Sequence, residues 1–545
     1  MADPDSFPSV YECFRTAAAR HPERPFLHVL NETAEAYRIA GGELSYGDML
    51  AAIDARAAAF EMAGYSTGHR IGLLLENRPS FFVNWLALNR LGASVVPINP
   101  DLKLVDLAYL IEHSEMSLCI AVEARMPDVQ RAIAEAGSKA ELIGPDADVP
   151  RVASDPSPGN PHEGTEAALL YTSGTTGLPK GCVLTNAYFL HCAGWYARLG
   201  GHCRLEPGGE RMLTPLPMFH MNAMACSTMA MIQCGGCLIV LDRFHPGTWW
   251  HSVAESRATI VHYLGVMPPL LMQAPETPAD KIHQVRFGFG AGVDPGLHAL
   301  FEDRFGFPLI EAWAMTETGL GGCIAASEEP RHVGTRCFGR PEADVDVRVV
   351  DDDRQDVSAG TPGELLVRHA GANPRRGFFD RYLKDEKATC EAWTGGWFHT
   401  GDVVQQNQDG TFIFVDRKKN VIRRSGENIA AVEVENTLSK HEDIEAAAVA
   451  AVPDVVRGDE VFACIVPARP IEPEQREAHA AGLVSWCLEQ LAYYKAPGYV
   501  SYIQDLPVTA TNKIQRAGVR DMAARLHGSG DCIDTRHLKK RTVSG

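Results

Sequence analysis

The chain has 545 residues, of which 45% are hydrophobic and 22% charged, and its formal net charge is -18 at pH 7. This length exceeds a single ordinary core, so the composition predicts a folded chain with more than one domain. The negative charge disfavours general binding to nucleic acid or to an anionic membrane, because the average field repels polyanions.

The first residues carry no recognisable targeting signal. Met1-Ala-Asp-Pro-Asp5 is acidic and lacks the basic-then-apolar order of a secretion signal. No apolar run reaches the roughly 20 residues that a membrane-spanning helix needs. We therefore expect no membrane span and a cytoplasmic location.

Helical and strand-like patterns alternate from about residue 45 to about residue 300. The apolar spacing predicts helices at Ala51–Ala63 and Ser80–Leu91, and short strands at Arg70–Leu75 and Ala93–Pro97. Such alternation is typical of layered α/β architecture.

A loop rich in glycine and hydroxyl side chains spans Tyr171-Thr-Ser-Gly-Thr-Thr-Gly-Leu-Pro-Lys-Gly181. Its glycines let backbone N–H groups approach phosphate oxygens, its hydroxyls add donors and its lysine supplies charge. It lacks the Gly-Lys-Ser/Thr ending of a Walker A loop and lies between two strand-like runs, so a P-loop NTPase is disfavoured. An ordinary polar surface loop is the alternative interpretation.

The chain has one CxxC pair, Cys234-Gly-Gly-Cys237. No second pair or nearby ligand set completes a zinc site, so we interpret these residues as buried cysteines beside a tight turn, with metal or redox use as the alternative.

The pattern changes in the last third of the chain. Val345 to Val367 alternates as an antiparallel hairpin region, and a helix at Val432–Lys440 and a strand at Ala446–Val452 follow a basic stretch. These changes predict an N-terminal domain over residues 1–417, a hinge at 418–419, a C-terminal domain over 420–527 and a flexible basic tail over 528–545.

The Gly/Ser/Thr loop resembles the signature loop of the adenylate-forming superfamily of acyl-CoA synthetases, adenylation domains and luciferases. Further segments resemble those of the superfamily in the same order along nearly the whole chain. The resemblance implies an α/β fold: a large N-terminal domain of several subdomains, layered α/β plus a small β-rich region, and a small mobile α+β C-terminal domain. It also implies that the ATP phosphates are bound by Thr172, Ser173, Gly174, Thr175, Thr176, Gly177 and Lys180.

Glu311-Ala-Trp-Ala-Met-Thr-Glu-Thr318 resembles the superfamily's aromatic-Gly-x-Thr-Glu segment. The resemblance implies that Trp313 stacks on adenine, Thr316 meets the phosphate and Glu317 binds Mg2+. Trp313 stands where tyrosine is usual and Ala314 where glycine is usual, which leaves the outline of the nucleotide and acyl pockets open.

Two more segments carry a histidine and an aspartate at recognisable places. Thr214-Pro-Leu-Pro-Met-Phe-His220 resembles the segment whose histidine borders the acyl pocket, and Trp397-Phe-His-Thr-Gly-Asp402-Val resembles the segment whose aspartate takes both ribose hydroxyls. Arg417 is the implied partner of Asp402 at the ribose. Taken alone, these residues also fit a structural histidine, a turn residue and a solvated charge.

The C-terminal motifs concern the thiol half of the reaction and the adenylation lysine. The resemblance implies a hinge at Lys419 and assigns Arg424-Ser-Gly-Glu-Asn-Ile429, with Gly426, to the loop that lines the pantetheine tunnel. Lys513 corresponds to the lysine that bridges the carboxylate and the α-phosphate, although Asn512 stands where glycine is usual.

The function implied by the resemblance is that of an AMP-forming carboxylate–CoA ligase, most similar to medium-chain or crotonobetaine/carnitine-type acyl-CoA ligases. Its cofactors are ATP, Mg2+ and coenzyme A, its partner is a small carboxylic acid, and a homodimer is compatible with it. Alternatives are loading of a carrier-protein thiol, luciferase-like oxidation of the adenylate and a nucleotide-binding interaction protein without catalysis.

The sequence does not name the acid. A betaine is one candidate, because a tryptophan ring attracts a trimethylammonium group by about 0.5 to 2 kcal/mol. Four tryptophans could serve in this way, and ordinary packing is the alternative explanation for them. The tryptophans concerned are Trp195, Trp249, Trp250 and Trp313.

Overall fold

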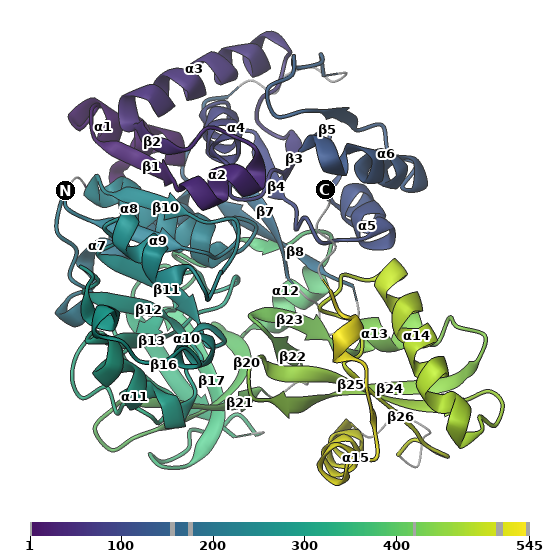
Figure 1. Cartoon of the computed structure of the whole chain (residues 1–545). Coiled ribbons are helices and arrows are strands. Elements are labelled where there is room, and N and C mark those ends of the chain that lie inside the picture. Colours follow the sequence, from purple (N-terminus) through teal and green to yellow (C-terminus); the bar gives the residue numbers. More distant parts are fainter. Residues whose placement is uncertain are drawn as a thin grey trace.

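The computed structural model describes residues 3–152, 159–172, 178–351, 353–417, 421–507 and 516–540. Two α/β layers and a small antiparallel region make up the first 417 residues, and a separate α+β domain follows (Figure 1). This confirms the fold class expected from the sequence.

One sheet of the N-terminal domain contains the strands between residues 70 and 185, joined by a short strand at residues 381–382. Its order is β18-β8-β7-β4-β3-β5-β6, parallel from β7 to β6, with β8 and β18 antiparallel to their neighbours. The strands are β3 (Arg70–Leu74), β4 (Ser94–Pro97), β5 (Leu118–Ala121), β6 (Glu141–Ile143), β7 (Glu166–Thr172), β8 (Lys180–Thr185) and β18 (Arg381–Tyr382). The helices between them are α3 (Tyr46–Met62), α4 (Pro79–Arg90), α5 (Leu104–Ser114) and α6 (Met126–Glu135).

The second sheet is parallel in its middle and antiparallel toward the β-rich region. Its order over the described residues is β16-β17-β20-β21-β15-β14-β13-β12-β11-β9-β10-β1-β2, with β19 beside β20. The strands are β1 (Pro25–Val29), β2 (Gly42–Ser45), β9 (Arg211–Thr214), β10 (Cys237–Val240), β11 (Ile260–Leu264), β12 (Phe287–Ala291), β13 (Leu309–Trp313), β14 (Ile324–Ala325), β15 (Cys337–Pro341), β16 (Val345–Val350), β17 (Pro362–His369), β19 (Trp393–Thr394), β20 (Trp397–Gln406) and β21 (Phe412–Arg417). Its helices are α1 (Val10–Arg20), α2 (Asn31–Tyr37), α7 (Asn186–Arg198), α8 (Thr228–Cys234), α9 (Trp249–Glu255), α10 (Met267–Met272), α11 (Pro295–Phe305) and α12 (Glu386–Ala392).

Local sequence explains where the first predicted helix begins. Ser45 and Asp48 form a capping box at the start of α3, with each side chain bonded to the other residue's backbone N–H. Such a box satisfies donors that the first helical turn leaves free. The predicted helices and strands between residues 51 and 97 are present with small shifts at their ends, and the predicted hairpin at 345–367 is the β16–β17 pair.

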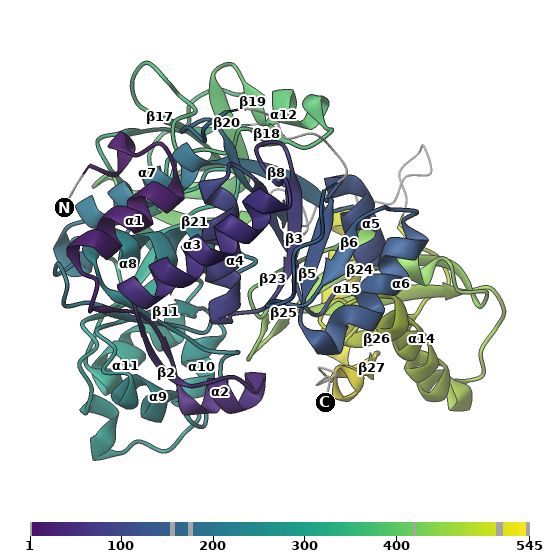
Figure 2. The ribbon, with the colours of Figure 1, turned by 90° about the horizontal axis from the view of Figure 1, so that it is seen from above.

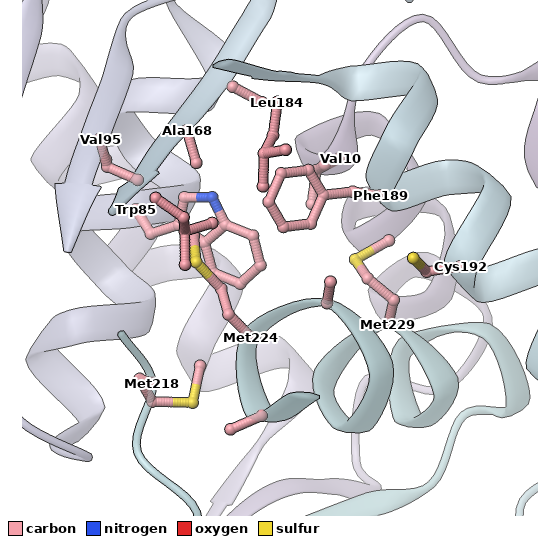
Figure 3. Close-up of a cluster of buried hydrophobic side chains, with 14 of the residues drawn as sticks. Val10, Trp85, Val95, Ala168, Leu184, Phe189, Cys192, Met218, Met224 and Met229 are labelled. Carbon is pink, nitrogen blue, oxygen red and sulfur yellow. The ribbon is translucent and has the colours of Figure 1, made fainter. Parts of the chain in front are cut away.

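The core between the two sheets is built from apolar side chains of many elements. Trp85 of α4 packs against Phe189 of α7, with ring centroids 5.5 Å apart. Val10 of α1, Met224 and Met229 lie around this pair (Figure 3). Because the pieces come from distant parts of the sequence, the N-terminal domain forms as one packed unit.

The CxxC pair belongs to this packing. Cys234 ends α8, Cys237 begins β10, and Gly235 between them adopts a left-handed conformation with φ of 66°. Both thiols are buried and free, and burial raises the pKa of each to about 12. The interpretation as buried cysteines beside a tight turn is confirmed. Over the described ranges, no three histidine, cysteine or carboxylate side chains are grouped so as to hold a metal ion.

The C-terminal domain has its own sheet and core. Its strands are β22 (Val421–Arg424), β23 (Glu427–Ala430), β24 (Ile444–Asp454), β25 (Gly458–Pro467), β26 (Tyr499–Tyr502) and β27 (Ile533–Asp534), and its helices are α13 (Ala431–Leu438), α14 (Arg476–Gln490) and α15 (Arg516–Ser529). β25 is central, paired with β22, β24 and β26.

The described part of the tail corrects the expectation of a flexible terminus. β27 pairs with β26, and Arg536 bonds Asp454 at 2.9 Å. Lys539 is buried, with its Nζ 2.5 Å from Glu460 Oε1, while Arg424 Nε lies 2.8 Å from Glu460 Oε2. Arg536 and Lys539, two of the basic residues of the tail predicted to be flexible, therefore serve as docking contacts.

Lys539 gives the C-terminal domain a pH dependence. Burial, together with the nearby Arg424, lowers the pKa of Lys539 to about 7, against about 10.4 for an unfolded lysine. Between these values the unfolded chain binds more protons than the folded one, so the free energy of unfolding increases as pH rises. We expect this increase from pH 7 to 9.5, and Lys539→Met should remove it.

This change should lower stability at pH 7, because it removes one partner of a buried charge pair, and Arg424 remains as the partner of Glu460. Urea unfolding can be followed by fluorine NMR of fluorotryptophan-labelled protein, in which Trp486 reports on the C-terminal domain. The exposed neighbour Lys540 provides the control variant, Lys540→Met. A pH slope unchanged in Lys539→Met would contradict the assignment.

Candidate functional site

The phosphate-loop candidate is carried by a β-hairpin. β7 and β8 are antiparallel, and Thr172 pairs with Lys180, so the loop between them leaves and returns at one point of the sheet. The central residues of the prediction, Ser173, Gly174, Thr175, Thr176 and Gly177, lie outside the described residues. Thr172 and Lys180 lie at the ends of this loop, as the sequence predicted.

Lys180 and Glu317 lie on either side of one tyrosine. The Nζ of Lys180 is 4.8 Å from the centroid of the Tyr382 ring and 3.4 Å from Asp385 Oδ2. The hydroxyl of Tyr382 donates to Glu317 Oε1 at 2.9 Å. Burial, with Glu317 next, raises the pKa of Tyr382 above its usual range, so this hydroxyl remains a donor. Two motifs more than 130 residues apart thus meet through Tyr382.

The backbone around Glu317 is also fixed. The Tyr188 hydroxyl donates to the Thr316 carbonyl at 3.0 Å, and Phe379 N–H donates to the Glu317 carbonyl at 2.9 Å. Glu317 itself is buried. A single held carboxylate suits Mg2+, which proteins usually bind through one or two carboxylates plus substrate phosphates.

Trp313 and Asp402 are in direct contact. The indole Nε1 of Trp313, at the end of β13, donates to Asp402 Oδ2 at 2.8 Å, and both residues are buried. Asp402 lies on β20 opposite Arg417 of β21 in the strand register. A carboxylate has about four acceptor positions, and this bond uses one of them and orients Asp402.

Because the family resemblance implies that Asp402 binds the ribose, removing the indole donor is expected to weaken nucleotide binding. We expect Trp313→Phe to raise the KM for ATP about tenfold with a smaller change in kcat, because a hydrogen bond to a charged acceptor contributes about 1.5–3 kcal/mol. The loss should be smaller for 2′-deoxy-ATP, which offers Asp402 one hydroxyl fewer. Trp397→Phe, on the same strand as Asp402, is the control. Equal losses for both nucleotides would contradict a role at the ribose carboxylate.

His220 meets the C-terminal domain. Its Nε2 lies 3.5 Å from Glu427 Oε2, and its ring centroid is 4.6 Å from that of Phe219. Gly426, one residue earlier, forms the turn between β22 and β23 with φ of 87°. A Cβ added there would lie 2.3 Å from Leu264 Cδ1, at the end of β11. The Gly426 turn is therefore packed against the N-terminal domain beside His220.

A buried polar cluster surrounds His262 of β11. His262 of β11 is fully buried, with Nε2 3.0 Å from the Tyr196 hydroxyl and Nδ1 2.9 Å from both Asn222 Oδ1 and the Ser227 hydroxyl. Burial lowers the pKa of His262 to about 3, so the ring is neutral. Asn222–Ser227 forms one turn of π-helix, a feature that often marks functional sites.

Some predicted residues cannot be placed. Lys513 and Lys419 lie outside the described residues, and for Arg417 only the backbone is described. Sequence reasoning missed Tyr382 and Glu427. The position of Glu427 next to Gly426 was a signal for it, whereas nothing local to Arg381-Tyr382 points to Glu317.

Comparison with protein families gives two matches. The profile described as AMP-binding enzyme matches residues 14–377, and the profile described as AMP-binding enzyme C-terminal domain matches residues 433–513. Together they contain Trp313, Glu317, His220 and Lys513, and they leave Asp402 and Gly426 between them.

Individual proteins resemble the chain over most of its length. Crotonobetaine/carnitine–CoA ligase of Salmonella typhi is 29% identical over 505 residues, covering 88% of this chain and 93% of that protein. A malonyl-CoA ligase solved with methylmalonyl-CoA and AMP is 26% identical, with a TM-score of 0.73 and coverage of 89% and 97%. The o-succinylbenzoate CoA synthetase of Bacillus subtilis shares the fold at 22% identity, with a TM-score of 0.78 and coverage of 94% and 98%.

Proposed function

This chain belongs to the AMP-binding enzyme family, and on that premise we propose that it is an AMP-forming carboxylate–CoA ligase. It adenylates a carboxylic acid with release of pyrophosphate and then transfers the acyl group to coenzyme A with release of AMP. The similar proteins named as CoA ligases support the choice of acceptor.

In the first half-reaction a weak carboxylate nucleophile approaches the α-phosphate of a highly charged nucleotide. Positioning and charge neutralisation supply most of the acceleration in such a reaction. We assign the ribose to Asp402, oriented by Trp313, and the leaving pyrophosphate to the loop ending at Lys180. Lys513 bridges the substrate carboxylate and the α-phosphate.

Mg2+ is the expected metal of this step. Glu317 would hold it, with Tyr382 fixing the carboxylate, and the ion would neutralise phosphate charge. Tyr382 donates to Oε1 and does not compete for the carboxylate as a cation would.

The thiol half is carried by one observation, the position of the Gly426 turn. The turn and Glu427 lie against Leu264 and His220 of the N-terminal domain. In this orientation a thiol entering beside Gly426 would arrive next to the histidine assigned to the acyl pocket. Attack at the acyl carbon breaks the bond to the phosphate oxygen, and AMP leaves. Rotation about Lys419 would exchange this arrangement with the adenylating one.

The acid is proposed to be small or medium-sized, with betaine-type acids included. The crotonobetaine/carnitine–CoA ligases among the similar proteins support a betaine. The tryptophans support it less, since Trp249 packs on Phe244 and Trp250 stacks on Phe305 at 4.4 Å. Trp195 packs beside Phe289 and Tyr196, close to the His262 cluster.

Pyrophosphate release tests the function directly. The purified protein is incubated with ATP, Mg2+ and a panel of aliphatic, aryl and betaine acids, and AMP release is then measured with and without coenzyme A. We expect pyrophosphate release with the preferred acid and AMP release that requires coenzyme A. Acyl transfer to a carrier-protein thiol, without CoA-dependent AMP release, would favour the alternative of a stand-alone adenylation enzyme.

The proposal also includes a cytoplasmic location and is compatible with a homodimer. Among the helices that the structure describes, none is long and apolar enough to cross a bilayer. Fractionation of cells and light scattering of the purified protein test these two points.

A further inference from the structure

A buried lysine lies at the boundary between the two domains. Lys495 follows α14 and is 5% exposed. Its Nζ lies 2.5 Å from Glu433 Oε1, in the same domain, and 3.8 Å from Asp106 Oδ1, in the N-terminal domain. The side chains of both acidic residues are also largely buried.

Both carboxylates lie in the first turn of a helix, Asp106 in α5 and Glu433 in α13. Helix N-termini favour negative charge, whereas burial raises the pKa of Glu433 to about 7 against the opposing effect of Lys495. Burial opposes the charge on Lys495, but Asp106 and Glu433 outweigh this and raise the pKa of the lysine. Lys495 is therefore an ammonium held between two helix starts.

A second contact across the boundary stands next to the first. The Asn99 amide donates to the Tyr494 hydroxyl at 3.0 Å, and Tyr494 is buried. Asn99 lies on the loop between β4 and α5, and both views show α5 beside the C-terminal domain (Figures 1 and 2). Tyr494 and Lys495 thus both contact the segment that leads into α5 and its first turn, at Asn99 and Asp106.

Rotation of the C-terminal domain would separate these pairs. Lys495 would keep Glu433, but Asp106 would lose its cation and Tyr494 its amide donor. Removing one partner of a buried charge pair is strongly unfavourable unless water replaces it. The pairs therefore favour the orientation in which they form, which is also the orientation that packs the Gly426 turn against Leu264.

We propose that Lys495, Asp106 and Glu433, with the Tyr494–Asn99 bond, form an interdomain latch that stabilises the thioester-forming orientation. These are positioning residues, remote from the reacting atoms. The assignment of the orientation rests on the proposed function. The latch predicts that its loss shifts the population of domain orientations toward adenylation without altering the reacting groups.

The central test uses the two half-reactions separately. Asp106→Asn keeps the shape of the side chain and removes its charge. We expect thioester formation from supplied acyl-adenylate to slow at least tenfold, while the rate of pyrophosphate release stays equal or rises. Asp128→Asn, which alters a surface ion pair on α6, is the control and should change neither.

A charge exchange guards against an effect of misfolding. Asp106→Lys alone should slow thioester formation more than Asp106→Asn. Adding Lys495→Glu should restore much of the rate, because the introduced ammonium group on α5 would then lie between two carboxylates. Equal slowing of both half-reactions in Asp106→Asn, or no rescue by the exchange, would overturn the proposal.

A readout independent of activity separates the latch from the function. Hydrogen exchange over residues 99–114 and 431–438 should be faster in Asp106→Asn than in the wild type, with no change at β12 or β13. If the wild type releases no pyrophosphate with any acid, the proposed function fails, yet this exchange difference still tests the contact. Unchanged exchange in these segments would refute the latch.

Discussion

Replacing Lys513 by alanine is expected to stop acyl-adenylate formation and to spare thioester formation from a supplied acyl-adenylate. The lysine would bridge the substrate carboxylate and the α-phosphate as charge moves between them. Removing one electrostatic stabiliser of a developing charge typically slows catalysis about 10²- to 10³-fold. The second half-reaction should change little, because the domain rotation carries Lys513 away from the site.

Pyrophosphate release measures the first half-reaction, and CoA-dependent AMP release from synthetic acyl-adenylate measures the second. Lys440→Ala, which removes an exposed lysine from the same domain, is the matched control. Equal loss of both half-reactions in Lys513→Ala would refute the division of labour between the two orientations.

Gly426→Leu should produce the opposite pattern. A side chain at φ of 87° costs about 1–2 kcal/mol, and its Cβ would overlap Leu264, so that repacking costs about 1–3 kcal/mol more. Because the strain is present in both domain orientations, only the repacking cost slows thioester formation selectively, by at least about fivefold, since 1.36 kcal/mol is tenfold. Adenylation should persist, because the turn is not part of that arrangement.

The control for backbone strain is Gly530→Leu. Gly530 has φ of 77° in the same domain but has open space around its Cβ position. Gly530→Leu should leave the rates of both half-reactions within about twofold of the wild type, a free-energy change well below the 1.36 kcal/mol of a tenfold effect. If Gly426→Leu slowed adenylation as strongly as thioester formation, the turn would not be specific to the second step.

The helices and strands predicted by name from the sequence are present in the structure, whereas the contacts between them were not predicted. The alternating apolar runs identified the layered region, because such signals depend on neighbouring residues. The tail was predicted wrongly, since a basic composition alone does not reveal that Lys539 meets a buried carboxylate on β25.

In the candidate site, too, the roles of single residues could be predicted from the sequence, but the contacts between them could not. Each motif proposed a role for a side chain, yet Tyr382 was missed because its partner Glu317 is 65 residues away, in the turn that follows β13. Likewise, the sequence assigned Trp313 and Asp402 to adenine and ribose separately, and their hydrogen bond was not foreseen.

By itself, the sequence determined the order of the motifs, the composition of the Gly/Ser/Thr loop and the glycine that suits the left-handed turn at Gly426, because these depend on residue type and local backbone. Only the tertiary structure decided which groups meet. Strand register and domain orientation bring Trp313 to Asp402, Glu427 to His220 and Lys495 to Asp106. Such pairs are separated by many residues and form only when sheets and domains pack, so no local pattern encodes them.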